Sequence, residues 1–465
     1  MRLALGEIMA AVQAEADIRP FADAACDLVT SDSRQARPGA LFCCLKGEHA
    51  DGHDFAAQAV ERGATALLAS RPLPEAEGRA AVLQVPDVLV AMGLLARHWR
   101  RRTRAVVAAL SGSAGKTTAK EMLASIASRM ASSIKNPGNF NNQLGLPLSM
   151  LAAGEEHRLW VLELGISRPG DMEELGAICE PDVAVVHNIG PAHLEGLGSI
   201  EGVGRAKAAL FHFLRPGGVA LANRDYPELW AAAREIRPDV LAMSTRDREA
   251  PYYCSFTGCG PDGRGLYRLN LQGLKLEVAL SCHGGHLAEN VLAAAATASV
   301  LGADARQIAE RLAAAELPGR RFDVRRMGQL AVIDDTYNAN PLSMAAAIES
   351  ARSLAGGGRL VLVLGEMGEL GPEADQAHQA LGECIARGGC DLLVFKGGAA
   401  GHVERGLRTA GYAGRFVPVE TPEEFEGVAR DMDIDEGAVL FKGSRSQRME
   451  DFLERFLATR VGESK

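Results

Sequence analysis

Apolar, β-branched runs alternate with alanine-rich helical stretches along most of this chain, and this alternation constrains the fold more than any other feature. Runs such as AVVAALS, DVAVVHNIG and RLVLVLG are typical of strands that are buried on both faces, whereas LAENVLAAAATASVLGA reads as a helix. Strand–helix–strand units place their strands parallel and their helices on the faces of the sheet. The sequence therefore predicts an α/β fold built on parallel sheets.

The length of 465 residues corresponds to about three domains. The pattern breaks at a basic stretch, Arg97–Arg104, and again at LPGRRFD near residue 318. We expect a small N-terminal α/β domain over 1–104, a central domain with a parallel sheet and a phosphate-binding loop over 105–317, and a C-terminal Rossmann-like domain over 318–465. We interpret the basic stretch as a solvated helix face.

The composition is that of an ordinary folded protein, with 47% hydrophobic and 23% charged residues. A net charge of −9 argues against a protein that coats nucleic acid or an anionic membrane. No run of about 18 uncharged apolar residues predicts a membrane span. Nine cysteines without a CxxC pair argue against a zinc site and for a reducing compartment. We expect a cytoplasmic protein without nucleic-acid or membrane partners.

The sharpest local motif is SGSAGKTT at residues 111–118, between an expected strand and an expected helix. In such a loop the backbone N–H groups point at phosphate oxygens, Lys116 reaches the β- and γ-phosphates, and a threonine hydroxyl can bind Mg²⁺. The full GxxxxGK[ST] pattern needs glycine at position 110, where this chain has Leu110, so the loop is a shorter relative of that pattern. Glycine-rich turns also occur as plain connections, but GKTT after a buried strand favours nucleotide binding.

Ionisable and amide side chains gather at further expected strand ends. Glu163 ends one strand, His193 follows the next, and Lys207 lies on the helix beyond. Two more strands lead into DDTYNANP at 334–341 and FKGSRS at 441–446. Taken alone, His193 and Lys207 are ordinary polar residues, and turn chemistry explains Asn, Asp, Pro and Gly in such loops. Carboxylates, amides and cations at several strand ends together favour a site for phosphate and an ionised substrate.

With these motifs the sequence resembles the ATP-dependent Mur ligases of bacterial peptidoglycan synthesis, over essentially the whole chain. The N-terminal part resembles the uridine-nucleotide domain of that family, and the other two parts resemble its ATP-binding and C-terminal domains. The segments that carry the resemblance are SDSRQARPGALFCCLKGEHADGHDF, SGSAGKTT, NPGNFNNQLGLPLSML, ELGISRPGDMEEL, HNIGPAHLEGLGSIEGVGRAKAALF, PGRRFD, DDTYNANP, GEMGELG and KGSRS.

The resemblance implies a ligase that joins D-alanyl-D-alanine to UDP-N-acetylmuramoyl-tripeptide through an acyl-phosphate. YNANP is typical of the dipeptide-adding member, and the DNPR motif of the enzyme that adds the third residue does not occur. The implied cofactors are ATP, Mg²⁺ as two ions, and a carbamylated lysine at Lys207. A monomer is expected.

The resemblance also assigns roles to individual residues. Lys116, Lys207, His193, Asn338 and Lys442 are expected to act in catalysis, and Thr117, Glu163, His193 and Lys207 to bind metal. ATP is expected to contact Gly112, Ser113, Ala114, Gly115, Lys116, Thr117, Thr118, Asn290, Arg321 and Asp335. The two other substrates are expected to contact Ser33, Arg34, Lys46, Gly47, Asp51, Gly52, Asn139, Asn141, Asn142, Asn340 and Ser444.

Two positions depart from the family pattern. Leu287 stands where many relatives have asparagine, which leaves the role of His286 open, and Arg205 stands where a relative often has lysine. We place the modified lysine at Lys207 by its spacing to the ALF segment.

Three other functions fit parts of the sequence. A sibling ligase that adds one amino acid, or a folylpolyglutamate synthase, would share the architecture, but the N-terminal match and YNANP argue against both. A GTPase switch would need an NKxD motif, which does not occur in the expected place. A silent UDP-sugar-binding regulator would not need Lys116, Glu163, His193 and Lys207 together.

Overall fold

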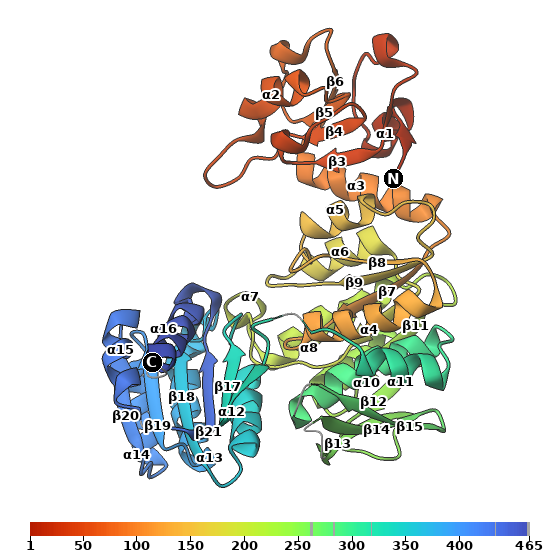
Figure 1. Ribbon diagram of the computed structural model, residues 1–465. Helices are drawn as coiled ribbons and strands as arrows, with labels where there is room; N and C mark the ends of the chain where they lie inside the picture. Colours follow the sequence, from red (N-terminus) through yellow and green to blue (C-terminus); the bar gives the residue numbers. More distant parts are fainter. Residues whose placement is uncertain (261–263, 282–283, 318, 433, 463–465) are drawn as a thin grey trace.

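The computed structural model describes residues 1–260, 264–281, 284–317, 319–432 and 434–462, and it is an α/β structure with three main sheets (Figure 1). The predicted fold class is confirmed. The three sheets form three successive units along the chain, with the N-terminal unit at one end and the C-terminal unit beside the central one (Figure 1). Pro318, where we expect the third domain to begin, and Cys282 lie outside the described residues, and the domain boundaries stay predictions.

The N-terminal unit is a small parallel sheet in the order β3-β4-β5-β6. Its strands are β3 (Leu28–Thr30), β4 (Ala40–Cys43), β5 (Ala66–Ala69) and β6 (Ala81–Gln84), and β1 (Leu3–Ala4) pairs separately with β2 (Ala25–Cys26). Its helices are α1 (Leu5–Val12), α2 (Ala56–Glu61) and α3 (Val88–Arg102). The buried apolar cluster of α1, β4 and β5 continues through α3 into the central unit, so these two units share one core.

The basic stretch is a solvated helix face only in part, since Arg101 and Arg102 are exposed but Arg100 is not. It forms the end of α3, and Arg100 is fully buried. The Arg100 guanidinium donates to the carbonyl oxygens of Cys179 at 3.0 Å and Ala105 at 2.9 Å, and to the Asp182 carboxylate at 2.7 Å. These carbonyls follow α6 (Asp171–Cys179) and precede β7 (Val106–Ser111), so the arginine ties the N-terminal unit to the central sheet.

The central unit is a nine-stranded sheet in the order β15-β14-β13-β12-β11-β10-β7-β9-β8, in which the β13–β14 and β14–β15 pairs are antiparallel and the other pairs are parallel. The further strands are β8 (Ser133–Lys135), β9 (Leu159–Glu163), β10 (Val183–Val186), β11 (Val219–Asn223), β12 (Leu241–Ser244), β13 (Tyr252–Cys259), β14 (Gly265–Leu271) and β15 (Leu274–Leu280). The further helices are α4 (Lys116–Met130), α5 (Gly145–Leu151), α7 (Leu194–Leu197), α8 (Ile200–Ala208), α9 (Pro227–Ile236), α10 (Ala288–Val300) and α11 (Ala305–Ala313).

Alternation of side chains along β7 explains why helices cover both faces of this sheet. Val107 and Ala109 pack into a cluster with α3, α5 and α6, whereas Ala108 and Leu110 pack into a cluster with α4, α10 and α11. The side chains of a strand that is buried on both faces are mostly apolar and need no hydrogen-bond partners. The chain leaves the core at the carboxyl end of such a strand. The expected strand, loop and helix at 106–130 therefore occur as β7, the loop 112–115 and α4.

The C-terminal unit is a six-stranded sheet in the order β16-β17-β21-β18-β19-β20, in which only β16 is antiparallel. Its strands are β16 (Asp323–Met327), β17 (Gln329–Asp335), β18 (Arg359–Gly365), β19 (Leu392–Lys396), β20 (Arg415–Val419) and β21 (Glu436–Lys442). Its helices are α12 (Pro341–Ala355), α13 (Ala374–Gly388), α14 (Ala400–Thr409), α15 (Pro422–Arg430) and α16 (Met449–Gly462). The β17–β21 register sets Asp335 opposite Lys442 at the carboxyl edge.

Among the described residues no helix has both the length and the apolarity that a membrane crossing requires. Six of the described cysteines are buried free thiols.

Candidate functional site

A cavity of about 660 Å³ lies between the central and C-terminal units. Its central wall comes from the loop after β7, the start of α4, the segment 139–142, the end of β9 and the start of α10. Its C-terminal wall comes from the loop after β17, the start of α12 and the end of β21. The carboxyl ends of two parallel sheets thus face one cavity, where ligands of such sheets bind.

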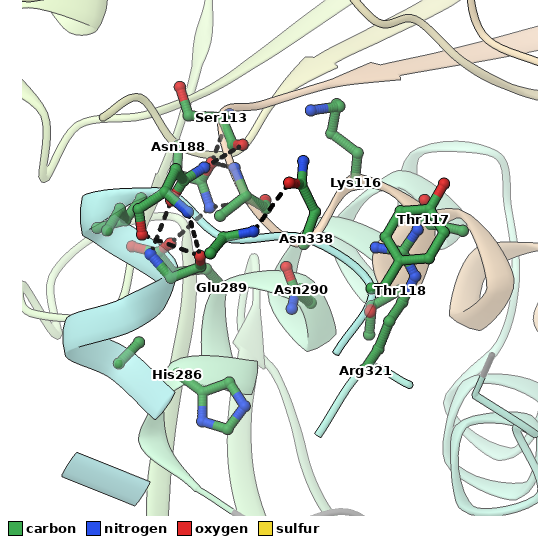
Figure 2. A pocket seen from close by; sticks show the side chains of 18 of the residues that line it. Ser113, Lys116, Thr117, Thr118, Asn188, His286, Glu289, Asn290, Arg321 and Asn338 are labelled. Carbon is green, nitrogen blue, oxygen red and sulfur yellow. Dashed lines mark hydrogen bonds between the residues drawn. The ribbon is translucent and has the colours of Figure 1, made fainter. Parts of the chain in front are cut away.

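The loop 112–115 leads into the N-terminus of α4, with Lys116, Thr117 and Thr118 in its first turn (Figure 2). Gly115 has φ +72°, and a Cβ there would lie 2.1 Å from Asn290 Oδ1, so both the backbone and the packing require glycine. Lys116 Nζ donates to the Gly112 carbonyl at 2.9 Å, and burial lowers the pKa of this amine. The first amides of α4 and a poorly solvated ammonium together favour a polyphosphate at this place.

Glu163, at the end of β9, is buried and held from one side only. Asn141 Nδ2 donates to Glu163 Oε1 at 2.7 Å, and Lys120 Nζ lies 3.7 Å from Oε2. Oε2 is buried and makes no hydrogen bond within the described chain. Asn136 fixes the backbone of Glu163 by donating to its carbonyl and accepting from its N–H, each at 2.9 Å. An anionic oxygen that accepts no hydrogen bond within the described chain, on a rigid strand end, suits a metal ion.

His193 and Lys207 lie in different surroundings. His193 lines the cavity, and its Nδ1 lies 2.5 Å from Glu369 Oε2 of the C-terminal unit, which lowers the pKa of Glu369. Lys207 on α8 is fully buried and does not line the cavity, and its Nζ has no hydrogen-bond partner within the described ranges. Burial first, and the nearby Lys116 second, hold the pKa of Lys207 well below its usual value. Among the described residues no three His, Cys, Asp or Glu side chains form a preformed metal cluster.

The C-terminal wall carries a buried ion pair. Lys442 Nζ donates to Asp335 Oδ2 at 2.7 Å and to the Asn338 carbonyl at 2.9 Å. Burial raises the pKa of Asp335, and Lys442 opposes that rise. The Arg321 guanidinium stacks 3.8 Å from the ring centre of Tyr337, which leaves a flat cationic surface at the cavity wall.

The Asn340 side chain makes hydrogen bonds within the protein that we did not expect of a residue that faces substrate. Its Oδ1 accepts from Ser343 N and caps α12, and its Nδ2 donates to the Ser113 carbonyl of the phosphate loop at 3.1 Å. Both side-chain groups are therefore in use, one within the C-terminal unit and one across the cavity.

The structure brings most of the predicted site residues together, but not all. Those that line the cavity are Ser113, Ala114, Gly115, Lys116, Thr117, Thr118, Asn139, Asn141, Asn142, Glu163, His193, Asn290, Arg321, Asp335, Asn338, Asn340 and Lys442. Those that do not line it are Ser33, Arg34, Lys46, Gly47, Asp51, Gly52, Gly112, Lys207 and Ser444.

The first six of the residues outside the cavity lie in the N-terminal unit, on η2 (Ser33–Gln35) and in the segment 46–52. Gly52 N donates to Leu45 O at 2.7 Å, and the backbones of Lys46 and Asp51 pair in an isolated antiparallel β-bridge. These contacts fold residues 45–52 into a compact hairpin that leads into η3 (Gly52–Phe55). Ser444 is buried next to Gly368, and its backbone N–H donates to the Glu366 carbonyl at 2.9 Å.

Among the polar residues that line the cavity, sequence reasoning missed Asn188, Tyr226, Glu289 and Glu369, and it left the role of His286 open. Asn188 is the second residue after β10, and its position near a strand end was a signal available in the sequence. His286 lies on η6 (Gly285–Leu287), and its Nδ1 is 2.6 Å from Ser350 Oγ of α12. That contact crosses between units, so no local pattern marks it.

Three family models match the chain in order. The Mur ligase family catalytic-domain model matches residues 26–100, the Mur ligase middle-domain model residues 110–298, and the Mur ligase glutamate ligase domain model residues 320–445. The chain is 35% identical to the UDP-N-acetylmuramoyl-tripeptide–D-alanyl-D-alanine ligase of Escherichia coli K12, over 92% of this chain and 93% of that one. The chain belongs to the Mur ligase family.

Solved structures agree with this Mur ligase assignment. MurF from Acinetobacter baumannii superposes with a TM-score of 0.88 at 31% identity, covering 98% of this chain and 99% of that chain. The MurF ligase of Thermotoga maritima in complex with ADP superposes with a TM-score of 0.85 at 28% identity, covering 94% and 98%. The family resemblance is confirmed, and the chain is an ATP-dependent ligase.

Proposed function

We propose that this Mur ligase joins D-alanyl-D-alanine to UDP-N-acetylmuramoyl-tripeptide, with ATP, in the synthesis of peptidoglycan precursors. The observation that carries the proposal is the cavity itself. It sets a phosphate loop on one sheet opposite Asp335, Asn338 and Lys442 on another, in a chain that matches ligases of that name over nearly its full length.

The reaction has two steps. A carboxylate oxygen of the tripeptide attacks the γ-phosphorus of ATP, and the bond from that phosphorus to the ADP oxygen breaks. The amine nitrogen of the dipeptide then attacks the acyl carbon, the bond to the phosphate oxygen breaks, and the nitrogen loses a proton. The first step is needed because a free carboxylate is too poor an electrophile for amide formation.

Residues on both walls would stabilise these steps. Lys116 and the α4 N-terminus offset charge on the β- and γ-phosphates, while Asn290 and Arg321 hold the base and sugar side of the nucleotide. Lys442 lies beside the place of the acyl-phosphate, fixed there by Asp335. A preorganised cation of this kind stabilises charge in the transition state without reorganising.

The donor set fits Mg²⁺. Glu163 Oε2, which accepts no hydrogen bond from the described residues, and the Thr117 hydroxyl offer oxygen ligands at the same cavity as the phosphate loop, and His193 faces that cavity too. Two Mg²⁺ ions would offset the negative charge of the phosphates and the carboxylate. Burial lowers the pKa of Lys207, and this favours the neutral amine that can add CO₂, lose a proton and become an anionic carbamate, which would supply an oxygen ligand to metal. Intact-mass measurement under CO₂ tests that modification.

The chain would work as a cytoplasmic monomer of three domains, 1–104, 105–317 and 318–465. The N-terminal loops that contain Ser33, Lys46 and Asp51 would hold the uridine nucleotide, and the segment with Asn139, Asn141 and Asn142 would guide the peptide to the cavity. The third domain would open for substrates and close for reaction. Closure excludes water, which would otherwise hydrolyse the acyl-phosphate.

Phosphate release tests the function directly. ATP, Mg²⁺, UDP-N-acetylmuramoyl-tripeptide and D-alanyl-D-alanine are supplied, and each is omitted in turn. We expect release only with all four present, and a product whose mass gains one dipeptide less water. Release with a single amino acid or glutamate instead of the dipeptide would refute the proposed substrate and favour a sibling ligase or a folylpolyglutamate synthase.

A further inference from the structure

Asn188, the second residue after β10, uses its whole side-chain amide on the phosphate loop and on Glu289 (Figure 2). Asn188 Oδ1 accepts from Ser113 N at 2.9 Å and from Ala114 N at 3.1 Å. Asn188 Nδ2 donates to the Ala114 carbonyl at 3.1 Å and to Glu289 Oε2 at 3.0 Å. All four hydrogen-bonding positions of the amide are therefore filled.

Glu289 determines which way this amide points. Its Oε1 accepts from Tyr226 Oη at 2.7 Å and from Asn223 Nδ2 at 3.4 Å, so Glu289 presents only acceptors to its neighbours. A reversed Asn188 amide would set its oxygen against the Glu289 carboxylate and its NH₂ against two backbone N–H groups. The observed orientation is the one that satisfies all of these groups.

The loop lies directly on the end of β10. A Cβ on Gly112 would be 2.5 Å from His187 Cε1 and 2.8 Å from Asn188 Oδ1. Ser113 N also donates to the Asn188 carbonyl at 3.2 Å, and His187 Nε2 lies 2.8 Å from the Ala114 carbonyl. Five hydrogen bonds from Asn188 and His187 thus fix the backbone of Ser113 and Ala114 with protein groups alone.

We propose that Asn188 is a positioning residue that holds the phosphate loop in its binding shape before nucleotide arrives, with Glu289 fixing the orientation of the Asn188 amide. Without Asn188, the N–H groups of Ser113 and Ala114 would lose their side-chain acceptor, and the loop would populate other shapes. The nucleotide would then select the competent shape at a cost in affinity. This inference rests on the nucleotide binding of the proposed function.

Hydrogen exchange and ADP affinity of Asn188→Ala test the inference. In the nucleotide-free protein we expect the 111–118 amides to exchange roughly tenfold faster than in the unaltered chain, and ADP to bind roughly tenfold more weakly in calorimetry. KM for ATP should rise more than kcat falls. The matched control is Asn270→Ala, which removes an acceptor for Gly273 N between β14 and β15, away from the cavity, and should change neither measurement.

Glu289→Gln is a second variant that tests the inference if Asn188→Ala does not fold, since it keeps the side-chain volume of Glu289. Gln offers an NH₂ group toward donors, so the loop should again exchange faster and bind ADP more weakly. Unchanged exchange in both variants would overturn the inference. Tighter binding of ADP by Asn188→Ala would also overturn the inference, because it would mean that the Asn188 side chain occupies the place of a phosphate oxygen. Failure of the unaltered chain to bind ADP would refute the proposed function, whereas the exchange comparison would still stand.

Discussion

Lys120 is a fully buried cation, and we expect its removal to loosen the segment that lines the cavity opposite the phosphate loop. It lies on α4, one turn after Lys116. Its Nζ donates to the carbonyls of Asn136 at 2.8 Å and Gly138 at 3.1 Å, and it lies 3.7 Å from Glu163 Oε2. Lys120→Met keeps most of the volume of the side chain but removes the charge and every donor.

The expected cost follows from these contacts. Hydrogen bonds to a charged group contribute roughly 1.5–3 kcal/mol each. Breaking a buried ion pair by removing one partner costs about 3–5 kcal/mol. Because the segment 136–140 reaches the cavity and can regain water, we take the lower end, about 3 kcal/mol, which lowers the midpoint of thermal unfolding by about 6–12 °C for a unit of some 200 residues.

The matched control is Lys135→Met. Lys135 forms an ion pair with Glu121, which also faces Lys120, but its side chain is 43% exposed, so its loss should cost at most about 1 kcal/mol. Thermal unfolding and the Michaelis constants are measured for both variants. For Lys120→Met, KM for UDP-N-acetylmuramoyl-tripeptide should rise more than KM for ATP. Equal midpoints for the two variants, to within about 2 °C, would refute the reasoning.

Three further changes test other parts of the structure. Lys116→Ala should lower phosphate release by at least roughly a thousandfold while the far-ultraviolet dichroism is retained, since a preorganised cation is lost, and normal turnover would contradict the assigned role. Arg100→Met should lower the unfolding midpoint because its carbonyl acceptors lose their donor, whereas exposed Arg101→Met should change it little. Burial lowers the pKa of His286 from 6.5 to about 4, so the folded state loses stability as pH falls from 6.5 toward 4, and His286→Gln should remove up to about 3 kcal/mol of that loss in acid unfolding.

The class of fold could be predicted because its signal is local. A strand that is buried on both faces reads as an apolar run, and a loop that turns from β7 into α4 needs glycine at position 115, where φ is +72°. The motif that marked nucleotide binding is contiguous for the same reason. The burial of Arg100 on α3 was not predicted because its partners lie far along the chain, and the sequence does not show that Arg100 meets Asp182.

The rest of the site could be predicted only in part, because a polar residue at a strand end has several possible uses. Asn340 was expected to face substrate, and it does line the cavity, but the sequence did not show that its side chain also caps α12 and donates to Ser113. Asn188 and Glu289 were overlooked for the opposite reason, since each resembles an ordinary turn or helix residue until both meet over the phosphate loop. The sequence shows which residue types can bind phosphate or metal, but only the three-dimensional structure shows which donor pairs with which acceptor.

The two walls of the cavity touch at the phosphate loop, and this contact links nucleotide binding to the docking of the C-terminal unit. Asn340 donates to Ser113 O, while Leu342 packs so closely on Gly190 that a Cβ there would lie 3.0 Å from the leucine Cβ. Gly190 N in turn donates to Ser113 Oγ at 3.0 Å. One serine is therefore held by both sheets, so any movement of α12 away from the cavity must break the Asn340 hydrogen bond to the loop residue that Asn188 keeps in place.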